Sequence, residues 1–327
     1  GGNNILRGNA MSNNTYNFAT LGDYLTQDVD SSNTVNGKKI YYWINVNDAP
    51  VPTDAGFIAL INSANITVKN FNLTNNGQGI LLVNSKNITL EKLITSTNLY
   101  AGVYLIGCVN CTILDSKANE NEHGVYLESS PNCSISSNQV MNNTYGIHLY
   151  ASANNNITQN EVGKNKYGIY LYGSSNNYIF HNNFAQNDNQ AAIPGSATNI
   201  WDNSYPSGGN YWSDYTGPDE CRGEFQNATG SDGIVDAPYV IGQSNVDHYP
   251  LCAPWSSPIN VIMPGNTTYR GTNITLIFTV DFSASWIAYS LDGQANVTIT
   301  GNTTLTDLSY GSHYVIVYAN DTLGNMH

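Results

Sequence analysis

The sequence predicts an all-β protein whose first part is a right-handed parallel β-helix. A leucine-anchored segment recurs at Leu60, Leu82, Leu105, Leu127, Leu149 and Leu171, with spacings of 22, 23, 22, 22 and 22 residues. A fixed period of about 20–29 residues is typical of solenoid proteins. Two short stretches of alternating apolar and polar residues fill each period, separated by Asn, Ser and Gly. This alternation favours strands over helices.

Composition excludes some classes of partner. The 327 residues leave room for two or three domains, and 11% of them are charged, with a net charge of −13. The 11 Lys and Arg residues form no basic patch, so nucleic acid is not expected as a partner. No apolar run reaches the length of a membrane span. Because the chain opens on Gly1-Gly2-Asn3, we expect it to be a processed or excerpted piece of a longer protein.

The repeat divides the chain into three predicted domains. Residues 1–190 form the β-helix, which is interrupted by an insertion at 23–54. Residues 191–256 form a capping module rich in aromatic residues and Asp, and residues 257–327 form an Ig-like β-sandwich. The insertion contains the strand-like stretch Ile40–Val46, which we expect to pack on the outside of the solenoid. Six alternating stretches follow residue 257, so the sandwich is predicted to lack its last strand.

Within each turn of the helix, alternation indicates which side chains point inward. In Gly-Val-Tyr-Leu127, Val125 and Leu127 are expected inside and Tyr126 outside. Stacking of the turns then aligns outward residues into a row of aromatic side chains. Such a row binds sugar rings in some proteins and stabilises the sheet in others. The predicted carbohydrate contacts are Tyr104, Tyr126, Tyr170 and, from the insertion, Trp43.

Asparagine is abundant, with 49 residues by direct count, and many of them begin glycosylation sequons. The 14 Asn-X-Ser/Thr sequons start at Asn13, Asn65, Asn72, Asn87, Asn110, Asn132, Asn142, Asn156, Asn227, Asn266, Asn273, Asn296, Asn302 and Asn320. Covalent N-glycans on some of these residues are predicted, which implies an extracellular location. The alternative is an Asn–Thr turn pattern that satisfies backbone groups.

The order of these motifs resembles one protein family. The repeated turns, followed by Asn210-Tyr-Trp-Ser-Asp-Tyr, Asp232-Gly-Ile-Val-Asp and Asp247-His-Tyr-Pro-Leu, resemble the NosD-like β-helix repeat proteins found on the surfaces of methanogenic archaea. The segment from Trp286 to Asn325 is similar to the Ig-like modules attached to such proteins. The resemblance implies an architecture but no activity.

Two metal ions, copper and calcium, are candidate ligands of this chain. The family name suggests copper, but His123 and His148 fall in different rows of the predicted sheet and the four Met residues are dispersed. Calcium is the stronger candidate, because hard cations need several carboxylate oxygens. The candidate ligands in the capping module are Asp214, Asp219, Asp232, Asp236 and Asp247. The alternative is that these residues cap turns.

The five cysteines suggest disulfides. An extracellular location favours a bridge between Cys221 and Cys252, which bracket the capping module. Cys111 and Cys133 occupy the same inward position in consecutive turns, within the Cα separation that a disulfide allows. Two free thiols that pack as small apolar groups are an equal alternative for this second pair.

Together these observations predict a secreted, glycosylated protein that is not an enzyme. No position holds acidic residues in neighbouring turns, as paired catalytic carboxylates would require. The predicted role is a structural subunit of a cell-surface layer, sheath or filament, which self-associates head to tail. The main alternative is a carbohydrate-binding or adhesion protein, and a polysaccharide-degrading enzyme or copper protein is a third.

Overall fold

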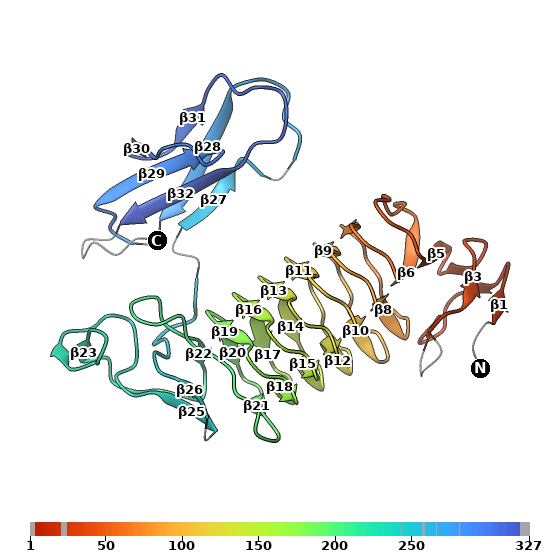
Figure 1. Ribbon diagram of the computed structural model, residues 1–327, viewed down its shortest axis with the longest axis horizontal. Coiled ribbons are helices and arrows are strands. Elements are labelled where there is room, and N and C mark those ends of the chain that lie inside the picture. Colours follow the sequence, from red (N-terminus) through yellow and green to blue (C-terminus); the bar gives the residue numbers. More distant parts are fainter. Residues whose placement is uncertain are drawn as a thin grey trace. The chain divides into compact units, whose positions relative to one another are not determined.

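The structure is a computed structural model, and it describes residues 4–20, 25–242, 244–256, 259–265, 267–280 and 282–320. The chain divides into two compact units, Gly1–Trp255 and Ser256–His327. As predicted, the first unit is a parallel β-solenoid, and the described residues of the chain contain strands and turns but no helix. In Figure 1 the strands of consecutive turns lie beside one another from β5 to β21.

One long sheet runs along the solenoid and carries the outward aromatic residues. It has ten strands, and every pair in it is parallel except β4 with β5. Its strands, in order, are β2 (Ala10–Met11), β4 (Thr34–Val35), β5 (Lys38–Ile44), β6 (Ala55–Ile61), β8 (Gln78–Val83), β10 (Ala101–Ile106), β12 (His123–Glu128), β15 (Tyr145–Tyr150), β18 (Tyr167–Tyr172) and β21 (Asn189–Ala192).

Two shorter parallel sheets complete the walls of the solenoid. The six-stranded sheet consists of β7 (Thr67–Lys69), β9 (Thr89–Glu91), β11 (Thr112–Leu114), β13 (Ser134–Ser136), β16 (Asn156–Thr158) and β19 (Tyr178–Phe180). The four-stranded sheet consists of β14 (Gln139–Met141), β17 (Glu161–Gly163), β20 (Asn183–Ala185) and β22 (Tyr211–Trp212). Strands β1 (Ile5–Leu6) and β3 (Asp28–Val29) form a separate parallel pair.

Asparagine marks a corner of the solenoid because the backbone there is left-handed. Equivalent residues of six consecutive turns have φ between 54° and 58°, namely Asn65, Asn87, Asn110, Asn132, Asn154 and Asn176. Asn adopts this conformation more readily than most residues, since its short amide bonds locally to the backbone. The Asn-led segments that define the repeat are therefore corners.

The glycine of each Gly-Val-Tyr-Leu segment is required by close approach of the next turn. A Cβ atom on Gly124 would lie 2.7 Å from the carbonyl oxygen of Gly146 and 2.4 Å from Cγ1 of Val140. The neighbouring turn repeats this contact, where a Cβ on Gly146 would lie 2.5 Å from the oxygen of Gly168. Glycine thus allows the turns to stack.

The interior of the solenoid is apolar, with polar ladders at its corners. Val103, Val125, Ile147 and Ile169 pair in register and are almost fully buried, as the alternation predicts. One corner is lined by a ladder of Asn side chains, each amide oxygen of which accepts the main-chain N–H of the turn before it. These residues are Asn98, Asn121, Asn143, Asn165 and Asn187. Buried amides satisfy the backbone of the corner in this way.

The region predicted as an insertion is part of the solenoid. Strand β5 pairs in parallel with β6 and belongs to the ten-stranded sheet. Its residues alternate between the two faces, with Tyr41 in the inner core and Ile40 and Tyr42 in the outer apolar cluster. The prediction that this strand packs on the outside was therefore wrong.

The residues that follow β21 pack on the end of the inner core. Trp201 and Trp212 are almost fully buried there, and Trp212 stacks on Phe184 with ring centroids 4.7 Å apart. Two antiparallel pairs lie in this region, β23 (Cys221–Arg222) with β24 (Ala228–Thr229) and β25 (Tyr239–Gly242) with β26 (Asn245–Asp247). These residues belong to the same compact unit as the solenoid.

The second unit contains two antiparallel sheets of three strands each. One consists of β27 (Ile259–Met263), β28 (Ile274–Val280) and β31 (Thr303–Leu305), and the other of β29 (Trp286–Leu291), β30 (Val297–Ile299) and β32 (Val315–Asn320). The six strands match the six predicted stretches. An Ig-like topology stays a prediction, and the proposed absence of a last strand concerns residues 321–327, outside the described residues.

Candidate functional site: an aromatic face on the solenoid

Outward side chains of the long sheet form a continuous aromatic cluster over four turns. We call it the aromatic face and define it by residues that belong to or directly precede β10, β12, β15 and β18. These residues are Tyr100, Tyr104, His123, Tyr126, Tyr145, His148, Tyr167 and Tyr170. The strand register aligns seven of them in two columns: Tyr104, Tyr126, His148 and Tyr170 pair in sequence, as do His123, Tyr145 and Tyr167. Tyr100 precedes β10 and contacts His123 edge-on at 5.1 Å.

The rings of each column stack on one another. The ring centroids of Tyr104 and Tyr126 are 4.8 Å apart, and their planes are nearly parallel, with an interplanar angle of 3°. The ring centroids of Tyr126 and His148 are 4.5 Å apart, with an interplanar angle of 11°. At the end of this column Tyr170 turns its ring to 89° from that of His148. The faces of the stacked rings cover one another, so the phenol hydroxyls and ring edges are the parts left for a ligand.

Exposure increases along the face towards β18. Tyr104 and Tyr126 keep 8% of their surface exposed, whereas Tyr170 is half-buried. A third column beside the aromatic face holds Tyr150 and Tyr172, which are 41% and 49% exposed and stack at 5.5 Å and 2°. The turns of β15 and β18 therefore form the open part of the site.

Carboxylates border the aromatic face on both sides. The Tyr104 hydroxyl donates a hydrogen bond of 2.5 Å to Oε2 of Glu128, and burial together with this bond raises the pKa of Tyr104. On the other side, Oε1 of Glu122 lies 4.0 Å from Nε2 of His123. Lys166 holds its Nζ atom 5.6 Å from the centre of the Tyr167 ring.

Two histidines touch at the centre of the face. Nδ1 of His148 lies 3.2 Å from Nδ1 of His123, so one ring donates a proton and the other accepts it. Burial, and secondly the neighbouring His148, lowers the pKa of His123 to about 3, and burial lowers the pKa of His148 to about 4. Both rings are neutral at pH 7. Nε2 of His148 is buried and has no hydrogen-bond partner in the described part of the chain.

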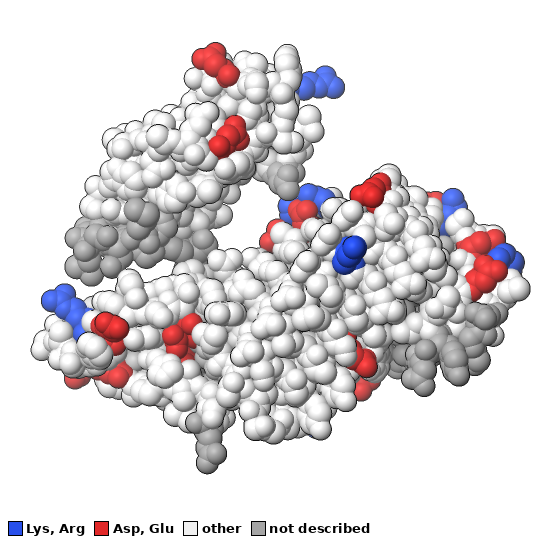
Figure 2. Space-filling model, in the orientation of Figure 1, with Lys and Arg blue, Asp and Glu red and all other residues white. Residues whose placement is uncertain are grey.

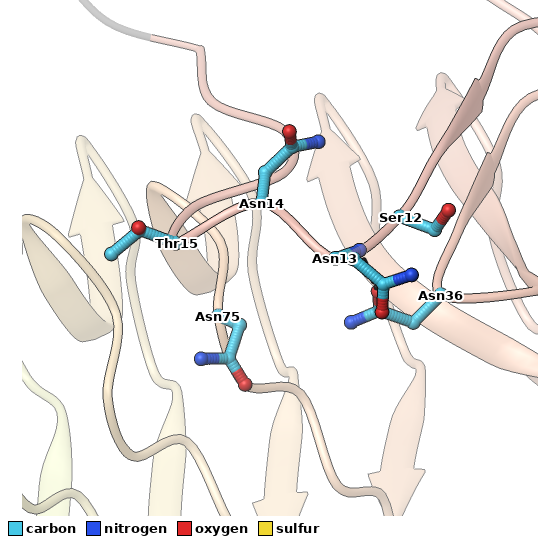
Figure 3. Close-up of a pocket in the computed structure, with 6 residues that line it drawn as sticks. All are labelled: Ser12, Asn13, Asn14, Thr15, Asn36 and Asn75. Carbon is cyan, nitrogen blue, oxygen red and sulfur yellow. Dashed lines mark hydrogen bonds between the residues drawn. The ribbon is translucent and has the colours of Figure 1, made fainter.

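A polar pocket lies near the N-terminal end of the solenoid. Its volume is about 710 Å³, and six uncharged residues line it: Ser12, Asn13, Asn14, Thr15, Asn36 and Asn75 (Figure 3). Oδ1 of Asn36 accepts the main-chain N–H of Asn13 at 3.2 Å, and the Asn17 amide holds the main-chain oxygen of Asn75 at 3.1 Å. The lining thus offers amides and hydroxyls.

The predicted sugar contacts are only partly gathered in one place. Tyr104, Tyr126 and Tyr170 belong to the aromatic face, although the first two are mostly packed. Trp43 does not, because it packs against the inner core and crosses Tyr41 at 5.8 Å and 74°. The contact between the two histidines was missed. The register did place them in different columns, as predicted, but adjacent columns touch diagonally.

The predicted calcium ligands hold turns together. Asp219 accepts main-chain N–H groups from Asp232 and Gly233, at 2.9 and 3.0 Å. Asp236 accepts those of Glu220 and Cys221, both at 3.1 Å. Asp carboxylates commonly cap turns in this way.

The two remaining acids of the calcium set have different surroundings. Asp214 faces the Tyr239 hydroxyl at 3.3 Å. Asp247 is fully buried and accepts hydrogen bonds from the Asn210 main chain and the Trp212 indole, and burial raises its pKa to about 7. Across the described residues, no group of three or more His, Cys, Asp or Glu is arranged to hold a metal ion. The geometry therefore favours the turn-capping alternative over calcium.

The five cysteines are free thiols. The predicted bridge between Cys221 and Cys252 is not formed, and in this structure that prediction was wrong. Cys108, Cys111 and Cys133 are buried in the inner core, where each thiol lies 3.5–3.6 Å from the carbonyl oxygen two residues earlier. This arrangement matches the free-thiol alternative.

Most sequon asparagines are accessible. Twelve of the 14 are exposed, Asn320 is half-buried, and Asn266 lies outside the described residues. Asn65 and Asn87 are also left-handed corner residues, and the Asn87 amide donates to Asn65 at 3.0 Å. The turn role explains why Asn occupies these corners, and attachment of glycans stays a prediction.

Two lysines share one carboxylate on the solenoid wall. Lys69 contacts Glu91 of the next turn at 2.8 Å. Lys92 contacts the same Glu91 at 3.3 Å. Charged groups are otherwise sparse, and the side of the molecule in Figure 2 is largely free of them.

Comparison with known families identifies the repeat. A family model described as periplasmic copper-binding protein (NosD) matches residues 7–217. The chain belongs to the NosD family. This agrees with the resemblance drawn from the motifs, and the family description agrees with a location outside the cytoplasm. The described part of the chain includes no helix long and apolar enough to cross a membrane. No curated protein matches the chain.

The residues of this NosD protein do not fit a copper site. His123 and His148 offer two nitrogens, but their Nδ1 atoms bond to each other. The three buried thiols face main-chain carbonyls. A copper ion needs further ligands in a defined geometry, and the described residues supply no such group. We therefore derive no step that involves copper.

Several solved structures are distantly similar to this NosD protein. The A-module of mannuronan C-5 epimerase AlgE6 from Azotobacter vinelandii is 16% identical with a TM-score of 0.33, over 49% of this chain and 55% of that one. The AlgE4 A-module of the same organism is 13% identical with a TM-score of 0.29, over 58% and 57%. The enzymatically active domain of bacteriophage CBA120 tailspike protein 2 is 12% identical with a TM-score of 0.33, over 82% and 55%.

These likenesses concern the fold alone, and the chain spans just over half the length of each structure. They nevertheless correct one prediction. The chain was expected not to be an enzyme, yet the proteins it resembles are two epimerase modules and an enzymatically active domain. The prediction that this protein is not an enzyme is therefore withdrawn.

Proposed function

We propose that this NosD-family protein binds extracellular polysaccharide along the aromatic face. The observation that carries the proposal is the continuity of the face, which stacks aromatic rings over the four consecutive turns of β10, β12, β15 and β18. Tyr150 and Tyr172 extend it with two rings that stay 41% and 49% exposed.

The spacing of the turns suits a sugar chain. Adjacent parallel strands lie about 4.8 Å apart, which is close to the length of one sugar unit in an extended polysaccharide. Each turn carries Tyr hydroxyl groups, which can exchange hydrogen bonds with sugar hydroxyls where they reach the surface. Glu122 and Glu128, at the borders of the face, accept hydrogen bonds from the same kind of group.

Packing of the sheet is the competing explanation for the aromatic residues. It accounts well for Tyr104 and Tyr126, which are 8% exposed and stack on each other, with His148 on the other side of Tyr126. It accounts less well for Tyr172, which leaves 49% of its surface in solvent. A binding role uses both groups, since the buried rings fix the positions of the exposed ones.

Affinity electrophoresis through gels that contain soluble polysaccharides tests the proposal. We expect retardation of the wild-type protein and about tenfold weaker binding, equivalent to about 1.4 kcal/mol, after Tyr172→Ala. Tyr178→Ala is a matched control, because Tyr178 is 50% exposed but belongs to the six-stranded sheet. The proposal fails if no polysaccharide retards the protein, or if both substitutions weaken binding equally.

A place on the cell surface and assembly into a layer, sheath or filament stay predictions. The periplasmic description of the family and the exposed sequons support a location outside the cytoplasm. Electron microscopy of native material tests assembly. Ordered filaments or sheets would support it, and monodisperse particles would contradict it.

A further inference from the structure

We infer that the ligand of the aromatic face is a neutral polysaccharide and not a polyanion. This inference rests on the proposed function and concerns the same site. It follows from the charges on and around the face.

Cations are sparse where a polyanion would need them, and Lys166 is the one that contacts a ring of the aromatic face among the described residues. In the stretch β8 to β21, all of it described, the strands of the long sheet contain no Lys or Arg. Lys166 directly precedes β18 and lies over the Tyr167 ring. A carboxylate that leaves water for a protein surface needs a cation or several hydrogen-bond donors to offset its lost hydration.

The histidines do not supply this charge. His123 is 5% exposed and surrounded by aromatic rings, so its imidazole stays neutral at pH 7. His148 is held in the same cluster and is also neutral. The face thus presents dipoles and no fixed positive charge at its centre.

Anions border the face on two sides. Glu128 accepts a hydrogen bond from the Tyr104 hydroxyl, which fixes a carboxylate beside the column of Tyr104, Tyr126, His148 and Tyr170. The side chain of Glu122 is 49% exposed at the opposite border. Carboxylates at both borders repel an acidic sugar chain laid along the columns, and the net charge of −13 adds to this effect at long range.

Isothermal titration of the full chain with three polymers of matched length tests the inference: a galactomannan, alginate and chitosan. We expect the galactomannan to bind with an affinity that changes less than about twofold between low and moderate salt. Alginate should bind at least about tenfold more weakly, and the double substitution Glu122→Gln, Glu128→Gln should narrow that gap.

The remaining outcomes separate the two claims. Alginate binding that equals or exceeds galactomannan binding, and that Tyr172→Ala abolishes, would overturn the neutral ligand but keep the proposed function. Tight, salt-sensitive binding of chitosan that the double substitution weakens would also overturn the inference of a neutral ligand, in favour of a cationic one. Binding of none of the three would remove support for the proposed function itself, and the inference would fall with it.

Discussion

Packing within the aromatic face determines the protonation state of His123 and His148. Their Nδ1 atoms are 3.2 Å apart, and the rings that surround them are Tyr100, Tyr126, Tyr145 and Tyr170. A charged imidazolium here would lose hydration, and Glu122, at 4.0 Å from His123, offsets little of that loss. Neutral histidines therefore form part of the packed face.

The pKa shifts predict how stability depends on pH. Both folded pKa values lie below the usual 6.5, so the stabilising contribution is complete above pH 6.5. It is lost as the pH falls towards about 4 for His148 and about 3 for His123, because the unfolded chain then binds protons that the folded protein excludes.

Replacement of both histidines by phenylalanine tests this dependence. The rings would still stack. Below pH 6.5 the unfolding free energy of the variant should fall less than that of the wild type, by on the order of a few kcal/mol. Urea unfolding at several pH values measures the change, and nuclear magnetic resonance of the imidazole nitrogens follows each protonation. Titration of His123 or His148 near pH 6.5 in the folded protein would refute the account.

At the residue scale, the 22-residue period predicts the columns but not the contacts between them. The equivalence of Tyr126 and His148 follows from counting 22 residues. The diagonal approach of His123 to His148 depends on side-chain rotamers that the period does not determine. For the same reason, Tyr104 and Tyr126 were predicted as exposed contacts but are mostly packed.

Among the elements, the corner ladders determine whether the turns stack. Asn160 is fully buried, and its amide donates to the main-chain oxygens of Ile135 and Thr158 and to the side chain of Asn182. Its own oxygen accepts the main-chain N–H of Asn138. One side chain thus satisfies backbone groups in two successive turns and bonds to a side chain of a third.

Asn160→Ala should be strongly destabilising, because it leaves these buried groups without partners. We expect a loss of about 2–5 kcal/mol in the unfolding free energy, since each unsatisfied buried group costs about 1–3 kcal/mol. Asn156→Ala is the control, because that side chain is exposed and should change stability by less than about 0.5 kcal/mol. Urea unfolding compares the two, and equal effects would contradict the role of the ladder.

The elements that the sequence predicted best are those that repeat. Strands β6 to β18 follow from the period and from the alternation of residues. Strand β5 was missed as a member of the sheet because its large residues, Tyr41 and Trp43, replace the small branched ones of later turns on the inner side. The pairing also shifts register between Lys39 and Ile40, which the period does not show.

At the scale of the whole molecule, the ten-stranded sheet forms one wall of the solenoid and also carries the aromatic face. Its N-terminal half is covered by Phe18 and other residues of the first turns, which pack on Tyr42 and Phe57. Its later turns carry the open aromatic columns. The whole-chain charge of −13 is compatible with a neutral ligand and disfavours an acidic one.

Hydroxyl-radical footprinting with and without a bound neutral polysaccharide tests the central claim most directly, because tyrosine side chains report their own exposure. The account predicts reduced oxidation of Tyr150, Tyr170 and Tyr172 in the complex. Tyr178 on the other sheet and Tyr310, which is 95% exposed in the second unit, should react as before. Protection of Tyr178 with unchanged oxidation of Tyr172 would contradict the assignment of the binding site to the aromatic face.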